Sequence, residues 1–157
     1  MDSKWDAELK KMVPKEEYRK TIAKVFDQNT IHTLHGLANQ GFFDQVEFIV
    51  STGKEAHVFR AKDNAENFRA VKIYKTLTST FREMMQYIEG DIRFKKIKRD
   101  KVSIVHAWTR KEFRNLELAT QPNVRVPLPI IFKNHVLVME FIGKNGEAAP
   151  RLKEKPP

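Results

Sequence analysis

The lysine at position 72 lies in the middle of a short run of residues that otherwise favours a buried β-strand. The run reads Ala70-Val71-Lys72-Ile73-Tyr74, and β-branched and aromatic residues of this kind are enriched in strands. Successive side chains of a strand point to opposite faces, so Lys72 shares its face with Ala70 and Tyr74. Because a lysine is rarely buried without a partner, the chain has to bring a counter-charge to this strand.

Two similar runs precede this one, and the three together predict an antiparallel meander. Val46–Val50, Ala56–Ala61 and Arg69–Tyr74 are rich in Val, Ile and Phe. Asp63–Asn67 supplies a turn between the second and third runs, and Ser51–Glu55 supplies one between the first and second. We therefore expect a small sheet in which the strand of Lys72 is the third.

The part of the chain before these runs has the spacing of helices rather than of strands. Acidic residues follow Pro14, and apolar residues then recur at helical spacing, which predicts one helix. Thr30–Gln40 predicts a second helix, with Gly41 at its C-terminal cap. We expect residues 1–41 to form a helical extension in front of a domain that spans residues 42–143.

The strongest helix pattern covers Ser103–Thr120. Glu112 stands on its apolar stripe, four residues from both Trp108 and Leu116. Because a carboxylate on an apolar stripe needs a partner, we expect Glu112 to pair with Lys72. The alternative is that Glu112 lies at the edge of the stripe, in contact with solvent. The stripe consists of Val105, Trp108, Leu116 and Ala119.

Three other segments have weaker patterns. Residues 76–101 predict a long mobile connection, helical in part, whose basic side chains form either a solvated surface or a contact for a partner. Pro129–Phe132 and His135–Met139 predict a hairpin with its turn at Lys133-Asn134, and residues 144–157 predict a poorly ordered tail. The basic residues of the connection are Arg93, Lys95, Lys96, Lys98, Arg99 and Lys101.

The composition limits the classes of function. The 157 residues carry a net charge of +9, which favours contacts with a polyanion or only keeps the surface soluble. The chain has no Cys, so disulfides and thiolate metal sites are excluded. No apolar run reaches the length of a membrane span, and the amino end lacks the core of a signal peptide, so we expect a cytoplasmic protein. His32 and His35 share one predicted helix, but without a third ligand we expect ordinary histidines rather than a metal site.

Four motifs, in order along the chain, resemble the RIO family of atypical Ser/Thr protein kinases. They are Ser51–Ala56, Ala70–Lys75, Trp108–Leu116 and His135–Gly143. The Lys75-Thr76 pair and the charged insert before the long helix resemble the Rio-one subgroup. The resemblance implies an α+β fold, the amino-terminal lobe of a kinase, with an antiparallel sheet of about five strands, one regulatory helix and the helical extension.

The resemblance also implies a site for ATP. Lys72 would hold the α- and β-phosphates, and Glu112 would orient it. Glu140 and Ile142 would present backbone groups to the edge of the adenine, with Phe141 between them. The other implied residues are a phosphate-covering loop, Ser51, Thr52, Gly53, Lys54 and Glu55, and the lining of the adenine pocket, Val58, Ala70 and Met139. The apolar members of this set would equally fit a plain hydrophobic core.

The loop and the catalytic motifs depart from those of ordinary kinases. The loop has one glycine and is neither Gly-x-Gly-x-x-Gly nor a Walker A loop, so phosphate contacts would fall to hydroxyl and backbone N–H groups. The chain contains no His-x-Asp and no Asp-x-Gly, the motifs that carry the catalytic and metal-binding aspartates of kinases. We therefore expect no catalysis and no metal site in this chain alone, with Mg²⁺ or Mn²⁺ bound only together with a missing carboxy-terminal lobe.

Two functions from different classes follow. By resemblance, the chain is the ATP-binding lobe of a kinase or ATPase that acts in maturation of the small ribosomal subunit, with rRNA or a ribosomal protein as partner. The alternative is a noncatalytic basic module that binds RNA or ribosomal proteins and keeps Lys72 and Glu112 only as a structural pair.

Overall fold

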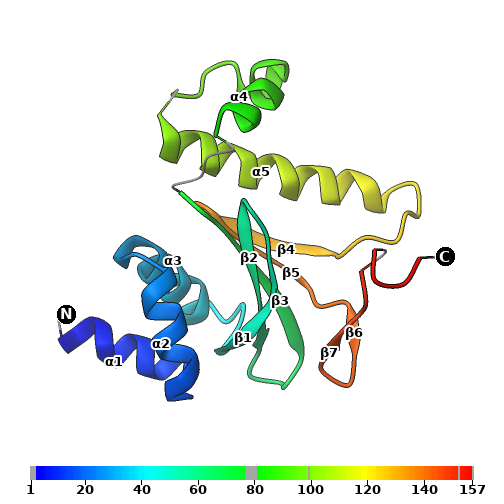
Figure 1. Ribbon diagram of the computed structural model, residues 1–157. Helices are drawn as coiled ribbons and strands as arrows, with labels where there is room; N and C mark the ends of the chain where they lie inside the picture. The colour runs from blue at the N-terminus through cyan, green and yellow to red at the C-terminus, as the bar shows by residue number, and fades with distance from the viewer. Residues whose placement is uncertain (1–2, 77–80, 99, 152, 157) are drawn as a thin grey trace.

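A five-stranded antiparallel sheet, with strand order β1-β2-β3-β5-β4, carries the rest of the fold (Figure 1). The computed structural model describes residues 3–76, 81–98, 100–151 and 153–156. The strands of the sheet are β1 (Gln45–Thr52), β2 (Ala56–Lys62), β3 (Phe68–Tyr74), β4 (Pro129–Lys133) and β5 (Val136–Glu140). The helices are α1 (Ser3–Met12), α2 (Glu16–Val25), α3 (Gln28–Asn39), α4 (Phe81–Glu89), the 3₁₀-helix η1 (Ile92–Phe94) and α5 (Lys101–Thr120). The predicted α+β fold with about five antiparallel strands is confirmed.

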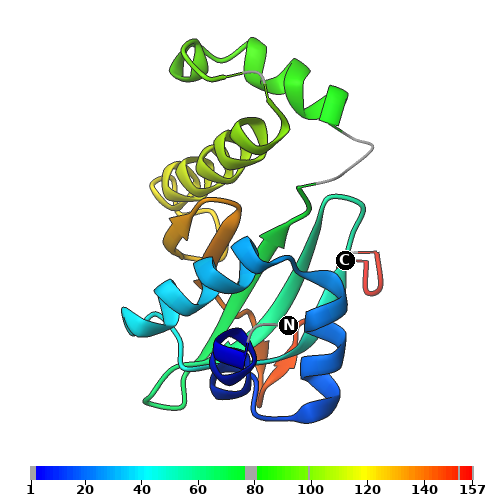
Figure 2. The same ribbon diagram turned by 90° about the vertical axis from the view of Figure 1, so that its left-hand side faces the viewer.

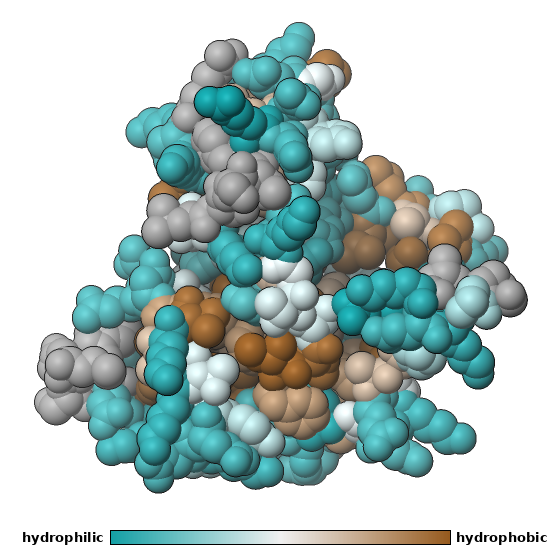
Figure 3. Space-filling model, viewed as in Figure 1, coloured by the Kyte–Doolittle hydropathy of each residue, from teal (hydrophilic) through white to brown (hydrophobic). Residues whose placement is uncertain are grey.

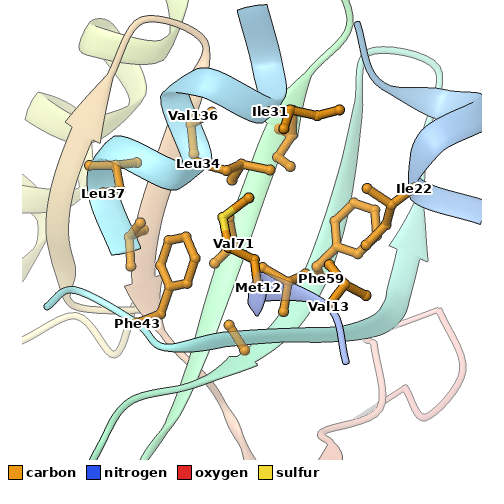
Figure 4. Packing of buried hydrophobic residues seen from close by; sticks show 14 of the residues in the cluster. Met12, Val13, Ile22, Ile31, Leu34, Leu37, Phe43, Phe59, Val71 and Val136 are labelled. Atoms are coloured by element: carbon orange, nitrogen blue, oxygen red, sulfur yellow. The ribbon is translucent and has the colours of Figure 1, made fainter. Parts of the chain in front are cut away.

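One face of the sheet packs against the helical extension. In Figure 2, α1–α3 lie in front of the sheet and α5 lies above it. Alternate residues of the strands, among them Phe59 and Val71, are buried against Ile22 of α2 and Leu34 of α3. Figure 4 shows these side chains converging from both layers. The extension therefore shares one hydrophobic core with the sheet.

Capping residues fix where α3 begins and ends. The Asp27 side chain accepts a hydrogen bond from the Thr30 N–H, which satisfies a free backbone donor of the first turn. Gly41 has a φ of +84°, the left-handed conformation that glycine adopts easily after a helix. The Thr30 hydroxyl lies 2.8 Å from Nε2 of the buried His135, so α3 is also tied to the start of β5.

The opposite face of the sheet packs against α5. Tyr74 of β3 and Val105 of α5 are both buried in this second core, to which Met84 and Ile88 of α4 also belong.

Figure 3 shows that the surface on the viewed side is mostly hydrophilic, with apolar side chains gathered near the middle of the view, over β1 and β2. Among the described residues, no helix combines the length and the apolar character needed to cross a membrane.

The connection between β3 and α5 is partly helical, as predicted, and it is packed to a degree that the sequence did not indicate. Met84, Ile88 and Phe94 are buried in the core formed with α5. The basic residues Lys95, Lys96, Lys98 and Lys101 are exposed, as is Arg93. The predicted contact residue Arg99 lies outside the described residues.

The rotation of α5 about its own axis differs from the prediction. Its buried residues are Ile104, Val105, Ala107, Thr109 and Phe113, whereas Trp108, Leu116 and Ala119 are only half-buried. Of the predicted stripe, Val105 is buried as expected, and the other three residues lie at the border of the buried face. The reason is that α5 lies over the edge strand β4, where the Phe113 ring packs 5.0 Å from that of Phe132.

Near the carboxy end, the position of one turn and part of the expected tail differ from the prediction. The turn of the β4–β5 hairpin is Asn134-His135 rather than Lys133-Asn134, because Asn134 takes the positive φ (+54°) and the His135 ring is buried. In the tail expected to be poorly ordered, residues 144–148 instead belong to a second hairpin, β6 (Gly143–Lys144) and β7 (Glu147–Ala148). Positive φ angles at Asn145 and Gly146, +53° and +79°, are those of a tight two-residue hairpin turn.

Replacing Met84 by Ala tests whether the connection packs on α5 in solution. The Met84 side chain is 1% exposed, so its truncation should lower the free energy of unfolding by about 2–5 kcal/mol. Ile92 in the same segment is 76% exposed, and Ile92→Ala should change stability by about 0.5 kcal/mol or less. Urea denaturation measures both variants, and equal effects would contradict the packed arrangement.

Candidate functional site

The ammonium group of Lys72 is held by both oxygens of the Glu112 carboxylate. Nζ lies 2.8 Å from Oε1 and 2.9 Å from Oε2, and both side chains are about three-quarters buried. The Tyr74 ring lies beside the same ammonium, with its centroid 4.9 Å from Nζ, close enough for a cation–π contact. The predicted contact between β3 and α5 is therefore present, and Glu112 does not lie free in solvent.

A cavity of about 270 Å³ lies between Lys72 and the β1–β2 turn. Its lining combines most of the predicted phosphate loop with the strand residues next to it. The lining residues are Ser51, Gly53, Lys54, Glu55, Ala56, Val58, Lys72 and Tyr74. Thr52 is not among them, because its hydroxyl lies 3.2 Å from Nδ1 of His57.

Backbone contacts hold the loop in a closed turn. The Gly53 N–H donates to the Ala56 carbonyl at 2.9 Å, so it is engaged within the turn. From β3, Lys75 donates its Nζ to the Gly53 carbonyl at 2.9 Å and its backbone N–H to the Glu55 carbonyl at 2.8 Å. The Ser51 hydroxyl accepts a long hydrogen bond, 3.4 Å, from Arg151. From the sequence, Lys75 was noted only as part of the Rio-one resemblance and Arg151 was not noted, since nothing in the pattern shows which carbonyl or hydroxyl a surface base will reach.

The strand register brings the predicted adenine-pocket residues to the face of Lys72. Val58 is directly opposite Lys72, and Met139 is directly opposite Ala70. Directly opposed residues of an antiparallel pair project to the same side, so these four side chains share one face of the sheet. Ala70 is buried, whereas Val58 and Met139 are half-buried at the border of this face.

The chain that follows β5 is held at Glu140. Both Glu140 oxygens accept hydrogen bonds from Arg125 at 2.9 Å, and Oε2 also accepts from the Leu128 N–H at 3.1 Å. The hydrogen bonds from Arg125 hold the pKa of the Glu140 carboxyl below its usual value. The Glu140 N–H donates to the Leu128 carbonyl at 2.8 Å, and the Phe141 ring packs on Phe68 with centroids 5.7 Å apart. No local pattern indicates this role for Arg125, which lies between Pro122 and Pro127.

The structure brings no metal-binding cluster together within the part of the chain that it describes. No three of its described His, Asp and Glu side chains are grouped so that they could hold an ion. His35, one of the two histidines weighed as ligands, lies beside Glu8 and Asn39.

Comparison with known proteins gives the family. A sequence model of the RIO domain matches residues 57–156. The chain belongs to the RIO domain family. This RIO domain is 42% identical over 146 residues to the serine/threonine-protein kinase rio1 of Dictyostelium discoideum, covering 92% of this chain and 25% of that one. It is 46% identical over 135 residues to the RIO-type serine/threonine-protein kinase Rio1 of Haloferax volcanii, covering 86% of this chain and 47% of that one. The RIO domain described here thus spans between a quarter and a half of these Rio1-type relatives.

A solved structure supports the fold. The Rio2 kinase of Chaetomium thermophilum, in a complex with ADP/Mg²⁺ and phosphoaspartate, matches this RIO domain with a TM-score of 0.53 at 22% identity. The match covers 72% of this chain and 32% of that one. At this level of identity the likeness shows a kinase-like fold and no more.

Removing Arg125 should release the Glu140 carboxylate. In Arg125→Met, the pKa of Glu140 should rise toward its ordinary 4.5, since the hydrogen bonds that favour the charged form are gone. Because the folded-state pKa lies below the unfolded one, the Arg125 contact stabilises the fold above pH 4.5 and its contribution is lost as the pH falls through the lowered pKa. An NMR titration of the Glu140 carboxyl carbon measures this pKa directly.

The control is Arg114→Met, which removes an exposed arginine paired with Glu117 on α5. It should leave the Glu140 titration unchanged. A Glu140 pKa that stays low in Arg125→Met would show that the pair does not form in solution.

Proposed function

We propose that this RIO domain is the ATP-binding lobe of a Ser/Thr protein kinase or ATPase. The observation that carries the proposal is the Lys72–Glu112 pair, which points an ammonium group into a cavity lined by the β1–β2 loop. A bidentate carboxylate holds a flexible lysine side chain in one place, which preserves a positive charge where a polyphosphate would lie. The kinase names of the Rio1-type relatives and the ADP in the Rio2 complex support the same assignment.

The proposed phosphate contacts come from Lys72 and from the loop above it. Lys72 would contact the α- and β-phosphates, while Ser51–Glu55 would cover the chain of phosphates. Since the Gly53 N–H is engaged with Ala56, the loop would contribute mainly the Ser51 hydroxyl and the Lys54 ammonium. Thr52 would take part only if its hydroxyl left His57.

The proposed adenine contacts come from the chain after β5, which we call the hinge (Glu140–Ile142). Val58, Ala70 and Met139 would provide apolar walls on the face of Lys72. The Glu140 N–H and the Ile142 carbonyl are already bonded to Leu128 and Ala149. We therefore propose that the Glu140 carbonyl accepts a hydrogen bond from the base and that the Ile142 N–H donates one to it.

The transfer step is proposed to use groups that this sequence does not contain. The chain carries no His-x-Asp and no Asp-x-Gly, so a catalytic aspartate and the ligands of Mg²⁺ or Mn²⁺ have no counterpart in it. We propose that the isolated chain binds nucleotide weakly and does not transfer phosphate. The proposed setting is the maturation of the small ribosomal subunit in the cytoplasm.

A second function, binding to RNA or to a ribosomal protein, is favoured by the exposed bases around η1. These side chains project from a segment whose apolar residue Phe94 is buried, so the bases are held on a packed surface. A row of exposed cations is suited to phosphate contacts, and within it Arg93 already pairs with Asp91. The described residues of the row are Arg93, Lys95, Lys96, Lys98 and Lys101.

Substitution at Lys72 and Glu112 tests the nucleotide site. Lys72→Ala should abolish ATP binding measured by calorimetry, because it removes the ammonium group that Glu112 holds at the cavity. Glu112→Gln should weaken ATP binding about tenfold. The free energy of unfolding should fall by only about 1 kcal/mol, because the glutamine carbonyl can still accept one hydrogen bond from Lys72. An unchanged ATP affinity in Glu112→Gln would count against the orienting role.

The matched control is Lys111→Ala. Lys111 stands next to Glu112 on α5 but donates to the Tyr87 carbonyl, away from the loop cavity. This variant should keep the ATP affinity of the parent chain.

Salt titration tests the RNA function independently. The affinity for a single-stranded RNA should fall with rising salt, with a log–log slope of about −0.7 for each phosphate contacted. Replacing Lys95 and Lys96 by Gln should weaken RNA binding, and Lys72→Ala should leave it unchanged. RNA binding that is lost in Lys72→Ala but kept in the Lys95/Lys96 variant would exclude the basic row as the contact.

A further inference from the structure

Arg60 of β2 is enclosed by two aromatic rings. Its guanidinium carbon lies 4.3 Å from the centroid of the Phe48 ring and 4.6 Å from that of Phe68. The Arg60 side chain is only 15% exposed, so these cation–π contacts are largely shielded from water. An arginine held in this way has a fixed plane and therefore fixed donor directions.

The donors of Arg60 join two distant parts of the chain. Nε donates to the carboxylate of Glu47 on β1, and Nη1 donates to the carbonyl of Gly146 in the β6–β7 turn. Glu47 is itself 19% exposed, so both ends of this ion pair are mostly out of solvent. Charge-assisted hydrogen bonds in such surroundings are stronger than those between neutral groups.

The hairpin fits closely against Arg60. A Cβ added to Gly146 would lie 2.6 Å from Nη1 of Arg60 and 2.9 Å from Cζ of Phe68. One added to Gly143 would collide with the Glu147 carbonyl oxygen and would lie 2.6 Å from the Phe141 ring. Both positions therefore favour glycine, and at Gly146 the hairpin turn packs directly against Arg60 and Phe68.

The hairpin is attached directly to the hinge. The Ala149 N–H donates to the Ile142 carbonyl at 2.9 Å, so the end of the hairpin returns to the hinge. The Phe141 ring packs on Phe68, the same ring that covers Arg60. The Arg125–Glu140 pair holds the start of the hinge, and the Arg60 contacts hold the part that follows.

We propose that Arg60 is a positioning residue that fixes the hinge for recognition of the adenine base. The inference rests on the proposed ATP site and assigns to it a residue outside the phosphate contacts. Arg60 acts through Gly146 and Phe68 on Phe141 and Ile142, which keeps the backbone groups of the hinge pre-organised. Without it, the hinge would have to be ordered on binding, and base recognition would weaken while phosphate recognition would not.

The experiment separates the base from the phosphates. ATP binding to the full chain is measured by calorimetry in Arg60→Met and Arg60→Lys, and inorganic tripolyphosphate is the probe for the phosphate contacts alone. Arg60→Met should lower the affinity for ATP about tenfold and leave that for tripolyphosphate unchanged. Arg60→Lys keeps the charge but loses the planar guanidinium group with its several N–H donors, so its loss of ATP affinity should be smaller.

The matched control is Lys62→Met. Lys62 lies two residues along β2, contacts the Phe68 ring and pairs with Glu66, but it has no bond to the hairpin. Its ATP affinity should stay at the parent value. Backbone hydrogen exchange of residues 143–149 is the second readout: it should be faster in Arg60→Met than in Lys62→Met, with or without nucleotide.

The outcomes distinguish this inference from the proposed function. An unchanged ATP affinity in Arg60→Met together with faster exchange in the hairpin would overturn the positioning role and leave the ATP site standing. Equal losses of ATP and tripolyphosphate binding would also overturn it, since the effect would then be on the whole lobe. A third outcome would contradict the proposed function itself. It is that the parent chain binds no ATP and binds tripolyphosphate no better than Lys72→Ala does. The adenine role of Arg60 would then be excluded as well.

Discussion

An ammonium group on the central strand of a sheet needs a counter-charge, and here a helix forty residues further along the chain supplies it. The Lys72–Glu112 contact is a polar link between β3 and α5, beside a second core of apolar side chains. Breaking it would leave two partly buried charges without compensation, which is costly. The position of α5 over the sheet is thus coupled to the state of Lys72. A ligand that competes for the ammonium would act on the helix as well.

The two cores cover the two faces of the sheet to different extents. The face toward α1–α3 is filled with buried side chains such as Phe59 and Val71, so that it is closed to solvent. The other face is only partly covered by α5, which leaves the strip from Lys72 to Met139 beside the loop cavity. One packed face and one partly open face of the sheet suit a binding site whose groups have to be held in place.

The contacts that the sequence revealed are those in which one residue breaks a local pattern. Lys72 in a strand and Glu112 on an apolar stripe could be paired because each needed a partner, and Gly41 could be assigned as a cap from its place after a helix. The meander followed from alternation and from the Asp63–Asn67 turn. By contrast, the rotation of α5 depends on where it lies over β4, which periodicity alone does not contain.

Other contacts arise only when distant segments meet. Arg60 and Gly146 are 86 residues apart. Asn145-Gly146 is a local signal for a hairpin turn, but nothing in either segment shows that this turn will contact Arg60. Arg125 pairs with Glu140 because the loop before β4 runs alongside the end of β5. The packing of Met84 likewise depends on the neighbouring α5. Each of these is a tertiary contact that local propensity does not encode.

The most direct test of the account is a crystal structure of this chain with a non-hydrolysable ATP analogue. The account predicts that phosphate oxygens lie within hydrogen-bonding distance of Lys72 Nζ while the contact between Lys72 and Glu112 persists. A triphosphate bound elsewhere, for example against the exposed bases around η1, with the loop cavity left without ligand, would contradict it.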